Sequence, residues 1–143
     1  MKKKLNCVLL VDDDEGTNFL NRMILEKTGV AEKIETVFNG KEALEYLTST
    51  GRYIKNGKTY PQPVLILLDI NMPVMDGWEF MEAYHNLPDH QKGKIVIVML
   101  TTSFNPDDRQ RAEKITEISG YSNKPLSEQM LRDILQKYFP DYL

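Results

Sequence analysis

Cysteine and histidine are almost absent from this sequence, which contains one cysteine and two histidines. A single cysteine, Cys7, excludes an internal disulfide and offers no spacing for a metal site, so we expect a small apolar residue at the edge of the first strand. His85 and His90 lie in a polar stretch, residues 84–94, with no carboxylate or cysteine at a ligand spacing. We therefore expect surface histidines rather than metal ligands.

Long apolar runs are also absent. The longest, residues 95–100, is far shorter than the roughly 20 residues that a membrane span needs. The basic N-terminus is not followed by the apolar stretch and cleavage site of a secretory signal, so we expect a cytoplasmic protein outside the membrane. A formal net charge of -3 gives nucleic acid no broad electrostatic reason to bind. The chain length of 143 residues predicts one domain, residues 1–143, without a separate output domain.

Three short apolar runs are present instead, at residues 7–11, 64–68 and 95–100. They are continuous rather than alternating, which is typical of parallel strands that helices cover on both faces. Residues 33–38 and 120–123 are more polar and indicate strands at or near the edges of the sheet.

Helical patterns fall between these runs, at residues 15–29, 40–49, 77–87, 105–118 and 127–139. Capping residues support several of the ends, with a glycine after the first helix, Asn-Pro at the start of the fourth and a serine before the fifth. Strands that alternate with helices of these lengths predict a doubly wound α/β domain with right-handed crossovers.

Two of the predicted helices differ in how much apolar surface they offer. The fourth has a thin stripe of Ala112, Ile115 and Ile118, which is typical of an exposed helix and is also compatible with a mobile one. The first has a stripe of residues along one side. Its members are Phe19, Leu20, Met23, Ile24 and Lys27.

The segment 48–63 is polar, contains glycine and proline, and is longer than a typical connection. Asn56 and Gly57 could form a hairpin turn there, with Tyr53 and Tyr60 on either side. Its basic residues could contact a partner, although a variable, solvent-exposed insertion is the better-supported interpretation.

Polar residues follow four of the predicted strands at the point where each strand ends. Asp12 and Asp13 follow the first strand, Asp69 the third, Thr101 the fourth and Lys124 the fifth. Each could be an ordinary turn or capping residue when taken alone. In open α/β sheets, however, the carboxyl ends of the strands converge on the ligand site, so we expect these side chains to meet.

Three clustered carboxylates repel one another unless a cation lies among them. Mg²⁺, which takes oxygen ligands and keeps several waters, fits this set. An aspartate beside Mg²⁺ is a plausible nucleophile for a phosphoryl group, with Lys124 neutralising the charge of the transferring oxygens and Thr101 donating a hydrogen bond to the product. The residues therefore indicate Asp69 as a phosphoryl acceptor.

The motifs "LLVDDDE", "LLDINMPVMDG", "MLTTS" and "NKPL" occur in this order along the chain. Together they resemble the receiver domain of bacterial two-component response regulators, of the stand-alone type found in chemotaxis. The resemblance covers nearly the whole chain. It implies a flavodoxin-like (βα)5 fold with a five-stranded parallel sheet in the order 2-1-3-4-5.

The resemblance also implies roles for individual residues. Asp69 takes the phosphoacceptor position, and the Mg²⁺ ligands are Asp12, Asp13, Asp69 and the main-chain carbonyl of Asn71. Thr101 takes the switch hydroxyl position and Tyr121 the switch aromatic position. Lys124 takes the phosphate-contacting position, and the Lys124-Pro125 peptide bond is expected to be cis.

A receiver of this kind takes its phosphoryl group from a phosphohistidine on a sensor histidine kinase or a histidine phosphotransfer protein. The expected result is a population shift on the face formed by the fourth helix, the fifth strand and the fifth helix, which binds a downstream target protein. A phosphorelay intermediate, a pseudo-receiver scaffold that is not phosphorylated, and a phosphorylation-dependent dimer stay open as alternatives. The protein is not expected to be an enzyme acting on outside substrates.

One position departs from the fast chemotaxis regulators, because Ser103 stands two residues after Thr101, where those proteins have an acidic residue. Their phosphoryl lifetime therefore does not carry over. A haloacid dehalogenase-type hydrolase is disfavoured, since it needs a second aspartate where this chain has Asn71. A flavodoxin-like cofactor protein is disfavoured too, because the aspartates after the first strand repel phosphate in the absence of metal.

Overall fold

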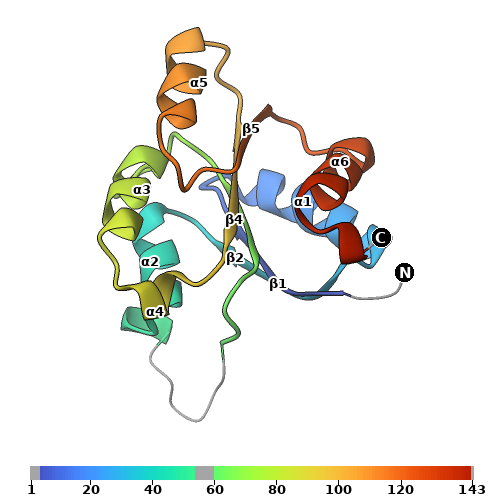
Figure 1. The fold of residues 1–143 in the computed structure, drawn as a ribbon, viewed down its shortest axis with the longest axis horizontal. Helices are drawn as coiled ribbons and strands as arrows, with labels where there is room; N and C mark the ends of the chain where they lie inside the picture. Colours follow the sequence, from blue (N-terminus) through green and yellow to red (C-terminus); the bar gives the residue numbers. More distant parts are fainter. Residues whose placement is uncertain (1–3, 54–59, 143) are drawn as a thin grey trace.

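The computed structural model describes residues 4–53 and 60–142 and shows a single parallel β-sheet with helices on both faces (Figure 1). The strand order is β2-β1-β3-β4-β5, which confirms the predicted flavodoxin-like topology. The more polar strands β2 and β5 lie at the two edges, as their composition indicated. The strands are β1 (Leu5–Val11), β2 (Ala31–Val37), β3 (Leu65–Leu68), β4 (Val96–Thr101) and β5 (Gly120–Asn123).

The helices form two layers, with α1 and α6 on one face of the sheet and α2, α3, α4 and α5 on the other (Figure 1). No helix in the described part of the chain is long and apolar enough to cross a membrane. The α-helices are α1 (Glu15–Thr28), α2 (Gly40–Thr48), α3 (Gly77–His85), α4 (Asp89–Lys92), α5 (Pro106–Glu113) and α6 (Glu128–Tyr138), and two 3-10 turns cover Gly51–Tyr53 and Pro140–Tyr142.

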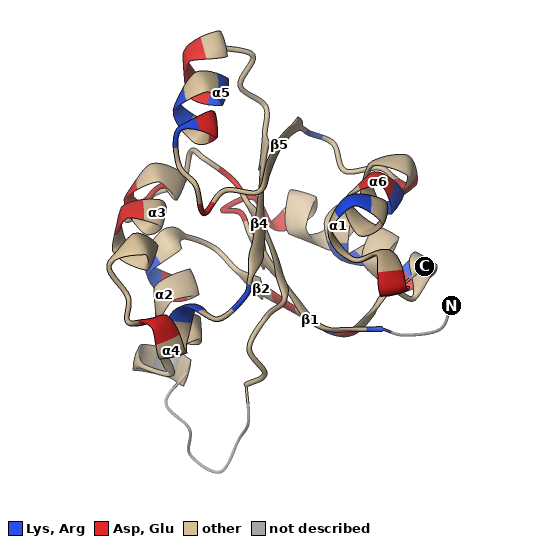
Figure 2. Ribbon diagram, viewed as in Figure 1, with Lys and Arg blue, Asp and Glu red and all other residues tan. Residues whose placement is uncertain are grey.

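The side chains of each central strand pack into two separate cores, because successive side chains of a strand point to opposite faces of the sheet. Leu9 and Val11 of β1 pack toward α2 and α3, whereas Val8 and Leu10 pack toward α1 and α6. Strands β1, β3, β4 and β5 contain no charged residue, and the charges lie on helices, loops and the edge strand β2 (Figure 2). This explains the continuous apolar runs in the sequence.

The predicted capping residues occupy the helix ends. Gly29 follows α1 in the left-handed conformation, with φ 66°. Asn105 accepts a hydrogen bond from the Asp107 backbone at the start of α5, and Ser127 accepts one from the Met130 backbone at the start of α6. These contacts satisfy backbone groups that a helix end leaves without a partner.

Most of the apolar stripe predicted for α1 faces solvent, although Ile24 packs partly against the core. Phe19 and Leu20 are 62% and 57% exposed, while the buried residues of α1 are Asn18, Asn21 and Leu25. The inner face makes a tertiary hydrogen bond, in which the Asn18 side chain donates to the Asp12 backbone carbonyl at 2.8 Å. The asparagine face of the helix thus lies inward and an apolar face lies outside.

Two helices differ from the prediction, one in its extent and one in its presence. α5 ends at Glu113, so Ile115 and Ile118 follow the helix, and Ala112 is the one buried residue of α5 itself. The short helix α4, Asp89–Lys92, was not expected in the polar stretch before β4. Cys7 is fully buried within β1, where we expected the edge of a strand.

Three tyrosines hold the described ends of the segment 48–63 against α2. The rings of Tyr46, Tyr53 and Tyr60 meet edge to face with centroid distances of 5.1 to 5.9 Å. The Tyr46 hydroxyl also donates a hydrogen bond to the Pro61 carbonyl at 2.8 Å. The expected hairpin turn at Asn56 and Gly57 lies outside the described residues.

Gly77 brings the start of α3 unusually close to the end of β3. A Cβ atom at this position would lie 2.5 Å from the Asp69 backbone oxygen, and the Gly77 amide donates to the Ile70 carbonyl at 2.7 Å. Helix α3 therefore rests directly on the backbone that carries Asp69.

We expect Leu25→Ala to lower the free energy of unfolding by about 2–5 kcal/mol, because it opens a cavity between α1 and the sheet. Leu20→Ala, the same change on the exposed face of α1, should cost less than about 1 kcal/mol. Urea denaturation of both variants measures the difference. Equal losses would contradict the orientation of α1 described above.

We expect Gly77→Ala to destabilise the fold by about 1–3 kcal/mol, because the added methyl group meets main-chain atoms that cannot move aside easily. Gly16→Ala is the matched control, since its Cβ would have only the Asp14 carboxylate within 4 Å. That change should be neutral or slightly stabilising in a helix. Thermal unfolding compares the two variants, and a Gly77→Ala protein as stable as the parent would refute the close approach.

Candidate functional site

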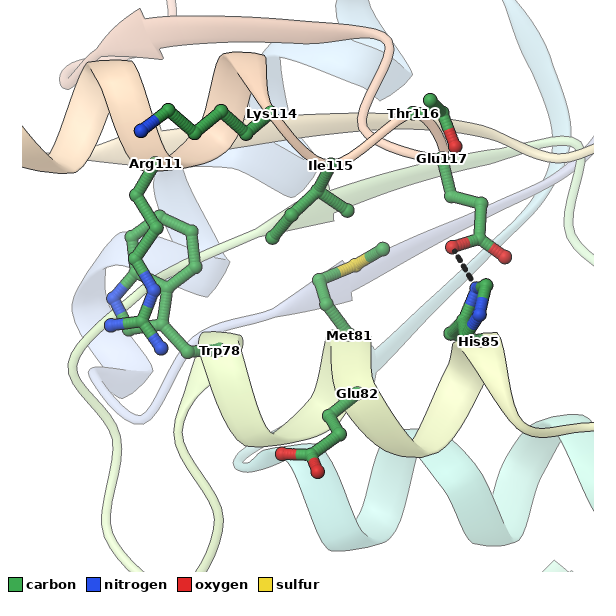
Figure 3. A pocket seen from close by; sticks show the side chains of 9 residues that line it. All are labelled: Trp78, Met81, Glu82, His85, Arg111, Lys114, Ile115, Thr116 and Glu117. Atoms are coloured by element: carbon green, nitrogen blue, oxygen red, sulfur yellow. Dashed lines mark hydrogen bonds and ion pairs between the residues drawn. The ribbon is translucent and has the colours of Figure 1, made fainter.

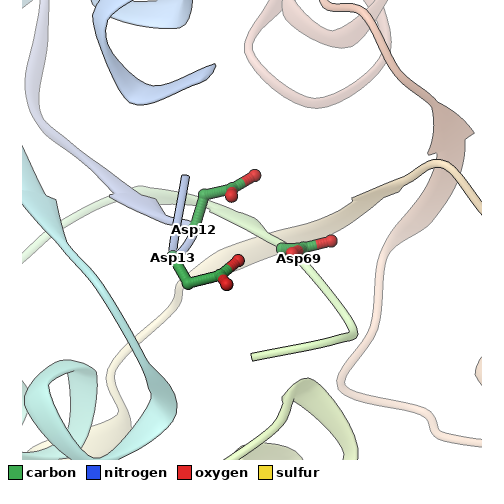
Figure 4. A group of neighbouring side chains, drawn as sticks. All are labelled: Asp12, Asp13 and Asp69. Carbon is green, nitrogen blue, oxygen red and sulfur yellow. The ribbon is translucent and has the colours of Figure 1, made fainter. Parts of the chain in front are cut away.

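Three aspartates converge at the carboxyl edge of the sheet (Figure 4). Asp12 and Asp13 follow β1, and Asp69 follows β3, which is the neighbour of β1 in the sheet. The parallel pairing of Val11 with Leu68 places Asp12 and Asp69 side by side. Each of the three can offer a carboxylate oxygen within 4.8 Å of the others. Asp12 and Asp69 are buried, whereas Asp13 is exposed.

Lys124 reaches the same point from β5. Its ammonium donates to Asp12 Oδ2 at 2.5 Å and lies 3.3 Å from Asp69 Oδ1. The Lys124-Pro125 peptide bond is cis, as predicted. The lysine side chain is 13% exposed, so this contact forms in a largely dry setting. The structure thus brings together four of the predicted site residues.

The charges in this cluster are out of balance. Burial and, second, the neighbouring Asp12 carboxylate together raise the pKa of Asp69 to about 6, because Lys124 only partly opposes them. Burial alone would lower the pKa of Lys124, but its contacts with Asp12 and Asp69 outweigh this and raise it. One ammonium therefore faces three carboxylates, and the site has room for additional positive charge.

Thr101 lies at the end of β4 and is fully buried. Its Oγ1 accepts a hydrogen bond from the Ser103 amide at 3.1 Å, and its carbonyl accepts one from the Lys124 amide at 2.8 Å. Ser103 continues the connection, because its hydroxyl donates to Asp108 Oδ2 in α5 at 2.6 Å. The loop after β4 is thus bonded to β5 on one side and to α5 on the other.

Tyr121 of β5 is half buried and packs beside α5. The Arg109 guanidinium lies 5.3 Å from the centre of the Tyr121 ring. The Tyr121 hydroxyl is buried near the Ser103 side chain, although no hydrogen bond of normal geometry joins it to a described residue. Burial raises the pKa of Tyr121, and the Asp108 carboxylate adds to the effect.

Asn18 and Asp14 support the acidic cluster and were not identified from the sequence. Asn18 fixes the Asp12 carbonyl, as described above, and the Asp14 amide donates to Asp12 Oδ1 at 2.9 Å. A signal for Asn18 does exist in the sequence, because Asn18, Asn21 and Leu25 share one face at helical spacing. Apolar periodicity alone favoured the opposite face. Asn71 is exposed in the loop two residues after Asp69.

The donor set suits a hard divalent cation. Carboxylate oxygens from Asp12, Asp13 and Asp69 lie close enough to share one ion, and the cluster contains no sulfur or imidazole ligand. Mg²⁺ prefers such oxygen ligands, and its charge would offset the repulsion that raises the pKa of Asp69.

Comparison with known proteins agrees with this geometry. A curated relative, the probable methanogenesis regulatory protein FilR2 of Methanothrix harundinacea, is 31% identical over 130 residues, covering 91% of this chain and 79% of that protein. A two-component response regulator from Cytophaga hutchinsonii is 32% identical, with a TM-score of 0.79, and the match covers 94% of this chain and 97% of the other.

The phosphorylated cyanobacterial phytochrome response regulator RcpA is 29% identical, with a TM-score of 0.75, and the match covers 96% of this chain and 94% of the other. Residues 8–136 match the family described as the response regulator receiver domain. A match over this much of the chain, on a sheet of the same topology, shows that the protein belongs to the response regulator receiver domain family, the signalling modules of two-component systems rather than classical enzymes.

Proposed function

We propose that Asp69 accepts a phosphoryl group from the phosphohistidine of a sensor histidine kinase or a histidine phosphotransfer protein, and that the phosphorylated domain changes its protein-binding surface. The observation that carries this proposal is the placement of Asp69. Its carboxylate ends a buried strand beside Asp12 and Asp13 and lies 3.3 Å from the Lys124 ammonium. This arrangement fits phosphoryl transfer, in which positioning and charge neutralisation supply most of the rate.

In the proposed step, an Asp69 carboxylate oxygen attacks the phosphorus atom and forms an O–P bond. The P–N bond of the phosphohistidine breaks, its electron pair returns to the imidazole, and the ring takes up a proton. Lys124 then moves from carboxylate to phosphoryl oxygens, and the Thr101 hydroxyl donates a hydrogen bond to the aspartyl phosphate.

Asp12, Asp13, Asp69 and the main-chain carbonyl of Asn71 would hold Mg²⁺ in this site. The ion, when bound, supplies positive charge at the transferring phosphoryl oxygens. The Asn18 and Asp14 contacts to Asp12 hold one carboxylate in place for this purpose. The raised pKa of Asp69 supports the proposal, since it reflects a carboxylate that is buried, and second the nearby charge of Asp12, with only partial compensation from Lys124.

The proposed switch runs through Thr101 and Tyr121. Thr101 is bonded to the Ser103 amide, and Ser103 is bonded to α5, so a shift of the threonine toward a phosphoryl group would pull on that helix. Tyr121 lies beside the same loop and would respond to its movement. The face formed by α5, β5 and α6 would then bind a downstream target, by a population shift between two arrangements.

A protein donor, rather than a small molecule alone, is supported by the apolar residues around the site. Several large apolar side chains are exposed, and each lies in the loop or helix that comes directly after a strand. A groove along α1, lined by Leu20, Met23 and Ile24, also reaches Lys124 itself. Exposed apolar residues of this kind are typical of a surface that binds another protein. The exposed large apolar residues are Phe19, Leu20, Met23, Phe38, Val74 and Phe104.

We keep two alternatives. A phosphorelay intermediate would use the same chemistry and pass the group to another histidine, which makes it a question of partner rather than of site. A scaffold that is not phosphorylated is disfavoured, because the acceptor, the other two carboxylates and the lysine are all present and adjacent.

Phosphoramidate, a small donor whose P–N bond copies that of phosphohistidine, tests the proposal. We expect intact mass measurement to show one added phosphoryl group on the parent protein in the presence of Mg²⁺. Asp69→Asn should show none, and removal of the metal by EDTA should abolish labelling of the parent. Asp76→Asn, which changes a nearby aspartate that caps α3, is the control and should still be labelled. Labelling of the Asp69→Asn protein would refute the assignment of the acceptor.

The raised pKa of Asp69 predicts a pH-dependent cost to stability in the metal-free protein. The folded state binds this proton more tightly than the unfolded state, so stability should fall as the pH rises from about 4 through about 6. Asp69→Asn removes this cost. In EDTA at about pH 8 it should be more stable than the parent by about 1–3 kcal/mol, and the difference should disappear below about pH 4.

Urea denaturation across this pH range measures the effect, with Asp133→Asn on the exposed side of α6 as control. Added Mg²⁺ should stabilise the parent and leave Asp69→Asn less affected. If the free energies of unfolding of the two proteins differed by the same amount at all pH values, the pKa of Asp69 would not be raised in the folded protein.

A further inference from the structure

A groove lies between α3 and α5 (Figure 3), and α3 and α6 lie on opposite sides of the sheet (Figure 1). Its cavity has a volume of about 340 Å³, within the range of ligand-binding pockets. Trp78 and Met81 of α3 form one wall, and Ile115, just after α5, forms part of the other. Met81 is buried and points toward Ile115, so the floor of the groove is apolar.

Two cations stand at one end of this groove. The Arg111 guanidinium lies 4.4 Å from the centre of the Trp78 ring, and Lys114, three residues later, is the C-cap residue of the same helix. Within residues 4–53 and 60–142, neither Arg111 nor Lys114 forms an ion pair with a carboxylate. Figure 2 shows that α5 carries both basic and acidic residues. Both positive charges are therefore free to meet an anionic partner.

The carboxylates near the groove do not balance these cations. Glu117, at the opposite end, already pairs with Lys92 at 2.7 Å and with His85 at 3.0 Å. Glu82 also lines the cavity, but it points away from Arg111 and Lys114 in Figure 3 and can offset only one of these two positive charges. The uncompensated charge at the rim is thus positive, next to an apolar floor.

We propose that this groove binds an amphipathic, acidic helical segment of a partner protein. An apolar side chain of that segment would enter the cavity between Trp78, Met81 and Ile115. Carboxylates on its flank would pair with Arg111 and Lys114, whose spacing of one helical turn matches acidic residues one turn apart on a helix. Helices that dock an apolar face into a groove between two helices are a recurring mode of recognition.

The walls of the groove start at the acidic site. Helix α3 rests on the backbone of Asp69 and Ile70 through Gly77, and α5 is tied to the loop after Thr101 by the Ser103–Asp108 hydrogen bond. Occupation of the groove and phosphorylation should therefore influence each other, a link that rests on the proposed function. Binding of the acidic segment itself does not depend on phosphorylation.

The test uses the unphosphorylated protein and a synthetic amphipathic helical peptide with leucine and phenylalanine on one face and glutamate on its flanks. Trp78 is the one tryptophan of the chain and lines the groove, so its fluorescence reports occupation directly. We expect a saturable change in emission. A second peptide with glutamine in place of glutamate should bind at least about fivefold more weakly. Added salt should lower the affinity of the acidic peptide.

The double variant Arg111→Gln and Lys114→Gln should weaken binding of the acidic peptide by about tenfold. The matched double variant Arg132→Gln and Lys137→Gln removes the same charge from α6 and should leave the affinity unchanged. Equal affinity for both peptides, no saturable change, or equal weakening by both double variants would overturn the proposal. Melting temperatures check that the variants fold.

Labelling by phosphoramidate separates this proposal from the proposed function. The Arg111 and Lys114 variant should be phosphorylated like the parent, because neither side chain contacts the acidic cluster. Loss of peptide binding with normal labelling supports the groove as a distinct site. Saturable peptide binding to an Asp69→Asn protein would support the groove even if Asp69 proved not to be the acceptor.

Discussion

Repulsion among three carboxylates at one edge of the sheet is the constraint on which the rest of this structure depends. Asp12 and Asp69 are side by side because their strands pair in register, and burial makes their mutual repulsion expensive. The Lys124 ammonium, which follows β5, neutralises part of that negative charge. The connections of Asp12 to Asn18 and Asp14, and of Thr101 to Ser103, all keep charged or polar groups in position around this edge.

Much of the fold could be predicted because several independent features of the sequence agree. Continuous apolar runs gave the central strands, polar composition gave the edges, and caps such as Ser127 and Asn105 gave helix ends. The convergence of Asp12, Asp69 and Lys124 follows from topology, since every parallel strand ends at the same edge. The fold can be predicted here because the apolar pattern, the capping residues and the strand topology all favour the same structure.

The remaining features depend on contacts between segments that are distant in the sequence. Apolar periodicity marked the side of α1 that mostly faces solvent, because it ignores polar contacts of the inner side such as the hydrogen bond from Asn18 to the Asp12 carbonyl. The closeness of Gly77 to Asp69 is likewise a main-chain contact across a loop, which no side-chain pattern reveals. The groove beside Trp78 arises where α5 stops at Glu113, and the sequence pattern continued that helix too far.

The tyrosine cluster on α2 has a consequence for how this domain can change through evolution. Tyr46 contacts both Tyr53 and Tyr60 and bonds to the Pro61 carbonyl, so the two ends of the segment between α2 and β3 are joined next to the sheet. The cost of closing the intervening chain grows only slowly with its length. Insertions and deletions can therefore accumulate there while the register of β3, and with it the position of Asp69, stays the same.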